Sequence, residues 1–466
     1  MGLLKRLFLV ENMLKPKDVR GDLPTTKEVY KKTFDMAWPS ALEAVLVALI
    51  SAFDMIMVGS LGKEAISAVG ICNQPKFICL APIFGINTAA IVLIARRKGE
   101  ERQKDANDFL KVAVLWSTIA TLLMCSLSYI FAEPLLAFAG AQADYIDQAV
   151  TYFRIVLIGL VPYSIGFTMS AAQRGAGNTR ISMITNLTAN IVNIIFNALL
   201  INGLLGFPRL GVKGAAIATT IGNIVSFIIA LISVTTGKRY LRITKDKIED
   251  FVDKCKSFYS IFLSSFGEQI ILRFGFFTYA KVVANLGTAD FAAHQVVCNI
   301  MTITFSFGDG LQVANTSLVG QSLGAKRDDL AKIYSRVTQT IGICIAVALA
   351  IVISRFSSLI CMAFTNDPEV IQLAHGPMQV LGILCLFQIP QVITVGALRG
   401  AGDVSFVTLM MFICVGLLRP GVSYLLVYPL NMGLLGAWFG CFVDQFSRFV
   451  YSLFRFRKGK WTQIQV

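Results

Sequence analysis

Long apolar runs alternate with short polar connections over almost the whole chain. A helix needs about 20 mostly apolar residues to cross a hydrocarbon core of roughly 30 Å, because only its own hydrogen bonds satisfy the backbone there. Such runs lie near residues 37–60, 66–95, 110–132, 150–173, 181–203, 212–237, 258–286, 291–323, 336–361, 371–398, 404–428 and 432–455. The pattern predicts an all-α membrane protein with twelve transmembrane helices, so that both termini lie on one side.

Composition agrees with this prediction. Of 466 residues, 55% are hydrophobic and 15% are charged, and the mean hydropathy is +0.66. A soluble domain is about 25% charged, so the composition excludes a soluble enzyme and a disordered chain. The ten cysteines form no Cys-x-x-Cys pair, and there are only two histidines. We therefore expect no disulfide framework, no zinc site and no cofactor.

The net charge of +14 is concentrated in particular connections. Lys and Arg cluster after the second, sixth and eighth runs and near the C-terminus, as at Arg96, Arg97, Lys98, Lys238, Arg239, Lys326, Arg327, Arg457 and Lys458. Loops on the opposite side are nearly free of them, as in residues 132–148. By the positive-inside rule both termini are cytoplasmic in the plasma membrane, and the charge indicates no nucleic-acid partner.

Three motifs occur twice, each time 225 residues apart. Residues 58–62 align with 283–287, 93–99 with 318–324, and 174–177 with 399–402. We therefore expect a cytoplasmic arm at 1–36, an N-terminal lobe at 37–237, a cytoplasmic linker at 238–257, a C-terminal lobe at 258–455 and a cytoplasmic tail at 456–466. Parallel repeats of six helices favour an alternating-access transporter, although duplication for structural reasons alone is the alternative. With both lobes in one chain, we expect a monomer in the lipid bilayer.

The residues resemble those of the multidrug and toxic compound extrusion (MATE) transporters. Pro39 stands fifteen residues before Asp54 in the first run, and residues 286–295, 318–325, 398–403 and 455–461 also match the family pattern. The resemblance implies two six-helix lobes that form a V. It also implies export of amphipathic, often cationic small molecules in exchange for protons or sodium ions. By the same resemblance, Asp54 falls on the family's first-helix carboxylate.

Acids inside the apolar runs are the first candidates for chemistry, because ionisable groups in a membrane are costly and usually paired or functional. Asp54 has no basic residue in its own run to neutralise it. A carboxylate withdrawn from water takes up a proton more readily, so Asp54 is a candidate ion-coupling group. The alternative is a structural, hydrogen-bonded acid.

Glu43 precedes Asp54 by eleven residues, which places both acids on one helix face about 16 Å apart. The 225-residue offset maps Glu43 onto Glu268. Either glutamate could bind a cationic substrate or a proton. For Glu268 the alternative is an internal ion pair with Arg273 that only stabilises the second lobe.

Asn193 and Asn197 are spaced i,i+4 and therefore project side by side. The resemblance places them, with Thr219 and Asp54, at the family's ion site, where the position of Asn197 carries an Asp. A sodium ion bound by these oxygen atoms and a proton held by Asp54 both remain possible, and paired asparagines that only join helices are the alternative. Gln388 stands where one branch of the family has a carboxylate, and it is a candidate for substrate or proton binding.

Other residues have predicted structural roles. Pro39 is expected to bend its helix, and Gly175, Gly177, Gly400 and Gly402 in the repeated Arg-Gly-Ala-Gly motifs are expected to form hinges or gates. Asp444 precedes Arg448 by four residues, which favours an ion pair. His294 is expected to pack or cap. Asp309, between two glycines, has no role that the sequence decides.

The leading hypothesis is an antiporter and not an enzyme, because no Ser/His, His/Glu or metal-ligand cluster is present. The alternative is a flippase for a lipid-linked precursor. Such a protein needs a basic cavity to hold a pyrophosphate, and the intramembrane basic candidates are few, chiefly Arg154, Arg273 and Arg419.

Overall fold

The computed structural model describes residues 8–14, 16–59, 61, 63–236, 240–244, 246–365 and 367–464, and within these residues it is helical without strands. The side chains of residues 17, 48–56, 58, 59, 63, 66 and 202 are outside the described part. The first half of the chain contains α2 (Thr26–Gly59), α3 (Lys63–Ile71), α4 (Asn73–Gly99), α5 (Gln103–Ile130), α6 (Ala132–Phe138), α7 (Ile146–Gly175), α8 (Thr179–Asn202) and α9 (Val212–Thr235). The second half contains α10 (Phe251–Ala284), α11 (Thr288–Gly324), α12 (Asp328–Arg355), α13 (Ser357–Met362), α14 (Pro368–Gly400), α15 (Val404–Met411), the π-helix η4 (Phe412–Leu418), α16 (Arg419–Val427) and α17 (Gly433–Arg457).

The helices reproduce the predicted spans. Within the described residues, nine segments are long and apolar enough to cross a membrane. The predicted spans at 37–60, 258–286 and 432–455 correspond to three further long helices, α2, α10 and α17, of 34, 34 and 25 residues. The all-α membrane fold with twelve long helical segments is therefore confirmed.

Two helices begin earlier than hydropathy indicates. α2 begins at Thr26 and α10 at Phe251, where the apolar runs predicted starts near 37 and 258. At α2 the reason is a capping box: the Thr25 amide donates to Glu28 Oε2 at 2.9 Å, and the Glu28 amide donates to Thr25 Oγ1 at 3.4 Å. Polar residues can form such a helix start, but they are invisible in a count of apolar residues.

The structure divides into two compact units by their internal contacts. Unit 2 contains residues 42–266, and unit 1 contains residues 1–41 and 267–466. The chain therefore passes into unit 2 within α2 and into unit 1 within α10. These two division points, after residues 41 and 266, are 225 residues apart, like the sequence motifs.

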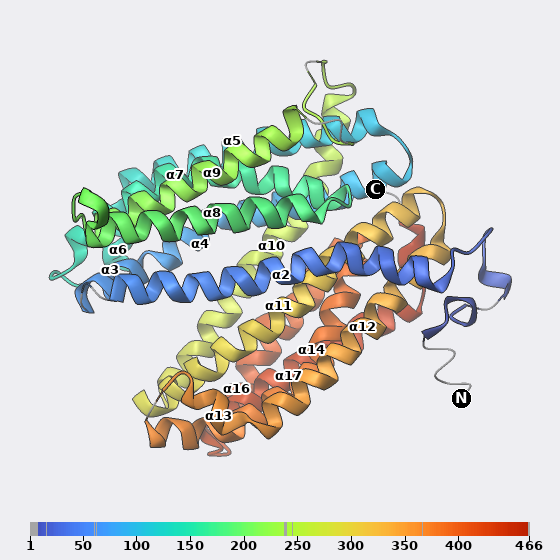
Figure 1. Cartoon of the computed structure of the whole chain (residues 1–466). Helices are drawn as coiled ribbons and strands as arrows, with labels where there is room; N and C mark the ends of the chain where they lie inside the picture. Colours follow the sequence, from blue (N-terminus) through green and yellow to red (C-terminus); the bar gives the residue numbers. More distant parts are fainter. Residues whose placement is uncertain are drawn as a thin grey trace. The chain divides into compact units, whose positions relative to one another are not determined.

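Unit 2 is a bundle in which α7 packs against α9, α8 against α9, and α4 against both α5 and α7, as the labelled ribbons in Figure 1 show. The first half of α10 belongs to this bundle. Trp116 on α5 lies 5.8 Å from the ring of Phe258 and 5.6 Å from that of Phe262. Gly85 on α4 permits the close approach, because a Cβ there would lie 3.1 Å from the Phe266 amide nitrogen.

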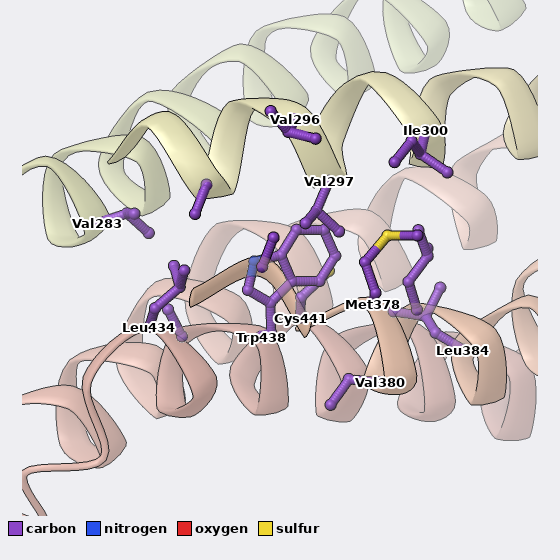
Figure 2. Packing of buried hydrophobic residues seen from close by; sticks show 14 of the residues in the cluster. Val283, Val296, Val297, Ile300, Met378, Val380, Leu384, Leu434, Trp438 and Cys441 are labelled. Atoms are coloured by element: carbon purple, nitrogen blue, oxygen red, sulfur yellow. The ribbon is translucent and has the colours of Figure 1, made fainter. Parts of the chain in front are cut away.

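Unit 1 is organised around α14, which packs against α11, α12 and α17. Figure 2 shows the interior of this unit, where the Trp438 indole is enclosed by aliphatic side chains, including Val297, and by Met378. Trp438 is 1% exposed, and burial of such a large apolar surface stabilises the bundle. The N-terminal segment also packs here, with Val10 and Met13 in a cluster with helices α11 and α12.

The repeated Arg-Gly-Ala-Gly motifs end equivalent helices in the two units. Gly175 at the end of α7 has its Cα side against the Ile91 carbonyl oxygen, 2.8 Å from where a Cβ would be, and Gly400 has the Thr316 oxygen at 2.3 Å. Gly177 and Gly402 follow with positive φ values of 81° and 89°, which glycine adopts without strain. The first glycine of each motif therefore permits helix contact, and the second permits the turn.

Candidate functional site

A buried carboxylate network in unit 2 is centred on Glu43, two residues after α2 enters that unit. Glu43 Oε1 accepts hydrogen bonds from Asn186 Nδ2 and from Ser182 Oγ, the latter at 3.2 Å. Arg174 Nη1 lies 3.7 Å from the same oxygen and donates to Ser182 Oγ at 2.6 Å. The other carboxylate oxygen, Oε2, is buried and has no hydrogen-bond partner among the described residues.

Aromatic rings support the arginine of this network. The Arg174 guanidinium carbon lies 5.4 Å from the centre of the Phe167 ring, within the range of a cation–π contact. Phe167 stacks in turn on Tyr163, with ring centres 5.6 Å apart. All of these residues lie on α7, so one helix fixes both the cation and the ring beneath it.

Unit 1 contains the equivalent pair, Glu268 with Arg399. Glu268 Oε1 accepts from Arg399 Nη2, and the Glu268 side chain is 2% exposed. Glu268 comes two residues after α10 enters unit 1, as Glu43 does after α2 enters unit 2. The structure therefore gives Glu268 a different partner from Arg273, the residue that the sequence offered.

Sequence reasoning identified both glutamates but missed both arginines as their partners. Arg174 and Arg399 were seen only as the first residues of the glycine motifs. A usable signal was present, because Glu43 maps onto Glu268 and Arg174 onto Arg399 with the same offset of 225 residues. A duplicated acid and a duplicated base form a candidate pair in both copies.

A second polar cluster in unit 2 lies between α8 and α9. Asn193 Nδ2 donates to Thr219 Oγ1 at 3.3 Å, and Asn197 Nδ2 donates to Asn193 Oδ1 at 3.3 Å. Asn193 and Asn197 are 6% and 2% exposed. The structure thus brings three of the four expected ion-coupling residues together, whereas the Asp54 side chain lies outside the described residues.

Two glutamines in the interior of unit 1 have no polar partners among the described residues. Gln388 and Gln391 on α14 are 1% and 0% exposed, and neither amide oxygen nor nitrogen of either residue has a hydrogen-bond partner. A buried amide without a partner costs about 1–3 kcal/mol. Such a position is suited to bound water or a polar ligand.

The remaining intramembrane charges are neutralised within unit 1. Asp444 Oδ2 lies 2.9 Å from Arg448 Nη2 and 2.6 Å from Arg419 Nη2, which confirms the predicted Asp444–Arg448 pair and adds a second arginine. His294 packs beside the rings of Tyr279 and Trp438, with centres 5.4 and 5.7 Å away. The predicted packing role of His294 is therefore confirmed.

Helix α2 continues through Pro39, and Asp309 lies on α11 between two glycines. Among the residues that the structure describes, no three His, Cys, Asp or Glu side chains form a group suited to a metal ion. The chemistry that the described site offers is therefore that of single carboxylates, arginines, amides and hydroxyls. These groups can hold a proton, a hard monovalent cation or a polar organic molecule.

Comparison with known proteins gives one consistent result. A protein-family model described as MatE matches residues 39–199 and 264–425. The chain is 27% identical over 456 residues to a probable multidrug resistance protein NorM of Thermotoga maritima, which covers 98% of this chain and 97% of that protein. It is 26% identical over 433 residues to an uncharacterized transporter, YisQ, of Bacillus subtilis, with 92% and 94% coverage. A mutant structure of the Vibrio cholerae MATE transporter VcmN matches with a TM-score of 0.87 at 18% identity, over 93% of this chain and 97% of that one.

Proposed function

This chain belongs to the MatE family of multidrug and toxic compound extrusion transporters, and from that premise we propose that it is a secondary active antiporter of the plasma membrane. It exchanges protons or sodium ions for amphipathic, often cationic small molecules by alternating access. Both termini are cytoplasmic in this proposal, as the positions of the basic loops favour. The protein works as a monomer, since the two repeats are in one chain.

The observation that carries the proposal is the polar cluster of Asn193, Asn197 and Thr219 inside unit 2. Its three side chains are joined by hydrogen bonds of 3.3 Å, so their oxygen atoms converge between two otherwise apolar helices. A hard cation prefers such oxygen ligands, and polar side chains at membrane depth are costly unless they have a function. Asp54 supplies the charge of this ion site in the proposal.

The two Glu–Arg pairs have a second role in this mechanism. Each pair joins the helix that has just entered a unit to the last turn of α7 or α14 in that unit. We infer that Glu43 and Glu268 respond to protons or to cationic substrate through these pairs, since loss of the carboxylate charge leaves an arginine uncompensated. Gln388 provides a polar group along the substrate path.

The hinges of the transport cycle are assigned to Pro39 and to the glycine motifs. Gly175 and Gly400 allow helices to approach closely, and Gly177 and Gly402 allow the turns that follow. A Cβ at any of these positions introduces a clash or an unfavourable φ. Movement of one helix end against its neighbour is therefore possible only with glycine there.

The electrostatics of the described residues disfavour the flippase hypothesis. A pyrophosphate cargo needs basic side chains that are available to it. Arg419 and Arg448 share Asp444, and Arg174 and Arg399 are paired with glutamates. A cationic or neutral cargo fits these neutralised arginines better than a polyanion does.

The test is efflux of a fluorescent organic cation from proteoliposomes, with a proton gradient and a sodium gradient imposed separately. We expect one gradient to drive export, and we expect Asp54→Asn to abolish it. Asp144→Asn, in an exposed loop of unit 2, is the matched control and retains export. Full transport by Asp54→Asn would remove Asp54 from the mechanism, and no export under either gradient would overturn the antiport proposal.

A further inference from the structure

A groove on unit 2 is formed by three membrane helices and has an almost entirely apolar lining. It has a volume of about 670 Å³, and its lining includes Cys125 and Tyr129 of α5, Leu157, Ile158 and Pro162 of α7, and Ile224 of α9. The side chains of Ile158 and Ile224 are 61% and 40% exposed. Because these helices span the membrane, a groove that exposes such side chains faces hydrocarbon and not water.

A single arginine lies at the rim of this groove. Arg154 precedes Leu157 and Ile158 by three and four residues on α7, so it lies on the same helix face one turn away. Its guanidinium carbon is 5.4 Å from the centre of the Tyr129 ring, and Tyr129 also lines the groove. The cation is therefore fixed over one end of the apolar cavity.

No acidic side chain of the described chain neutralises Arg154. Ion pairs account for Arg174, Arg399, Arg419 and Arg448, but none involves Arg154. Its Nε is buried and has no hydrogen-bond partner among the described residues. Arg154 differs in this respect from the intramembrane arginines that are paired.

The depth of Arg154 makes an uncompensated charge costly. It lies eight residues after the start of the 30-residue helix α7, which is about 12 Å along a helix of about 45 Å. If α7 is centred on a hydrocarbon core of roughly 30 Å, Arg154 lies about 4–5 Å below the edge of that core. An arginine at this depth extends toward the lipid phosphates, and the neighbouring Tyr129 is the kind of residue enriched at that level.

We propose that this groove is a binding site for a phospholipid with a net negative headgroup, taken from the leaflet that contains the α5–α6 turn. An acyl chain fills the apolar groove, and Arg154 binds the phosphate. Arginine suits this role because its planar fork forms two parallel hydrogen bonds to phosphate oxygens. A zwitterionic headgroup places an amine beside the same cation, so an anionic lipid binds more tightly.

The site is separate from the proposed transport chemistry. Its residues lie on α5, α7 and α9, and none of them belongs to the Glu43 network or to the cluster around Asn193. The bound lipid is therefore a component of the folded transporter and not its cargo. Loss of the lipid and loss of antiport can be measured independently.

Native mass spectrometry of the full-length protein in detergent tests the proposal, with phosphatidylglycerol and phosphatidylcholine as probes. We expect phosphatidylglycerol to bind about tenfold more tightly than phosphatidylcholine. Arg154→Gln should abolish this preference, whereas Arg154→Lys should keep part of it. The matched control is Arg209→Gln, an exposed arginine of the same unit, which should leave both affinities unchanged.

A second variant tests the acyl-chain half of the site. Ser126 also lines the groove, and Ser126→Trp fills it without altering the charge. We expect this variant to bind both lipids more weakly and to elute as a folded monomer in size-exclusion chromatography. Equal binding of the two lipids to the unmodified protein, or an unchanged preference in Arg154→Gln, would overturn the proposal.

Discussion

Glu268→Gln removes the charge from the more buried of the two repeated carboxylates. Glu268 is 2% exposed at its side chain, and its Oε1 pairs with Arg399. Glu43 is 12% exposed and accepts from Ser182 and Asn186 as well as facing Arg174. The same substitution at these two positions therefore compares an ionic pair with an ionic pair supported by neutral groups.

The two costs can be worked from these contacts. Breaking a buried ion pair by removing one partner costs about 3–5 kcal/mol, because the other charge is left uncompensated. The amide that replaces the Glu268 carboxylate would retain one hydrogen bond, so we expect the lower end, about 3 kcal/mol. At Glu43, Asn186 and Ser182 still contact the amide, and Arg174 keeps its bond to Ser182. The loss there is that of one charged hydrogen bond, about 1–1.5 kcal/mol.

Thermal unfolding of the purified protein in detergent measures the difference. Each kcal/mol shifts the Tm of a unit of this size by about 2–4 °C, so Glu268→Gln should lower the apparent Tm by about 6–12 °C and Glu43→Gln by about 2–6 °C. The exchange Glu268→Arg with Arg399→Glu should recover part of the loss. Equal shifts at Glu268 and Glu43, or no recovery in the exchanged pair, would refute the reasoning.

Three further variants test other parts of the structure. Gly400→Ala should lower the Tm, because its Cβ would lie 2.3 Å from a carbonyl oxygen, whereas Gly421→Ala, with no atom within 4 Å, should raise the Tm through helix propensity. Lys254→Met should destabilise the protein at neutral pH. Burial opposes the charge of Lys254, but hydrogen bonds to two aspartates outweigh it and raise the pKa, so the stabilisation is present below the ordinary value of 10.5 and the Tm difference should shrink above it. Thr219→Val should reduce gradient-driven export roughly tenfold, as for the loss of one hydrogen-bonding ligand, and unchanged export in the proteoliposome assay would exclude Thr219 from the ion site.

Hydropathy and the internal repeat predict most of the helical organisation, because both are local or periodic properties of the sequence. The positions of the long helices depend on apolar runs, which can be read directly. The start of α2 at Thr26 could not be read in this way, since a capping box of polar residues determines it. A search for the Thr-x-x-Glu pattern before the first run detects this earlier start.

Side-chain pairing was harder to predict than the helices. Glu268 and Arg399 are 131 residues apart, and no periodicity within one helix connects them. Arg273 was offered as a partner because it shares a helix with Glu268, although an i,i+5 spacing does not align two side chains well. The Asp444–Arg448 pair was predicted correctly because i,i+4 spacing alone brings those groups together.

The differences between the repeats support unit 2 as the place of ion coupling. Ser182 and Asn186, which solvate Glu43, align at the 225-residue offset with Val407 and Met411, so the pair in unit 1 has no equivalent neutral support. A carboxylate with neutral donors around it can lose its charge at a smaller cost than one that faces only an arginine. Reversible changes of charge therefore cost less in unit 2, which also contains the cluster around Asn193. In unit 1 the same position is better suited to a permanent ion pair, and a transport cycle that titrated Glu268 while Glu43 stayed charged would contradict this assignment.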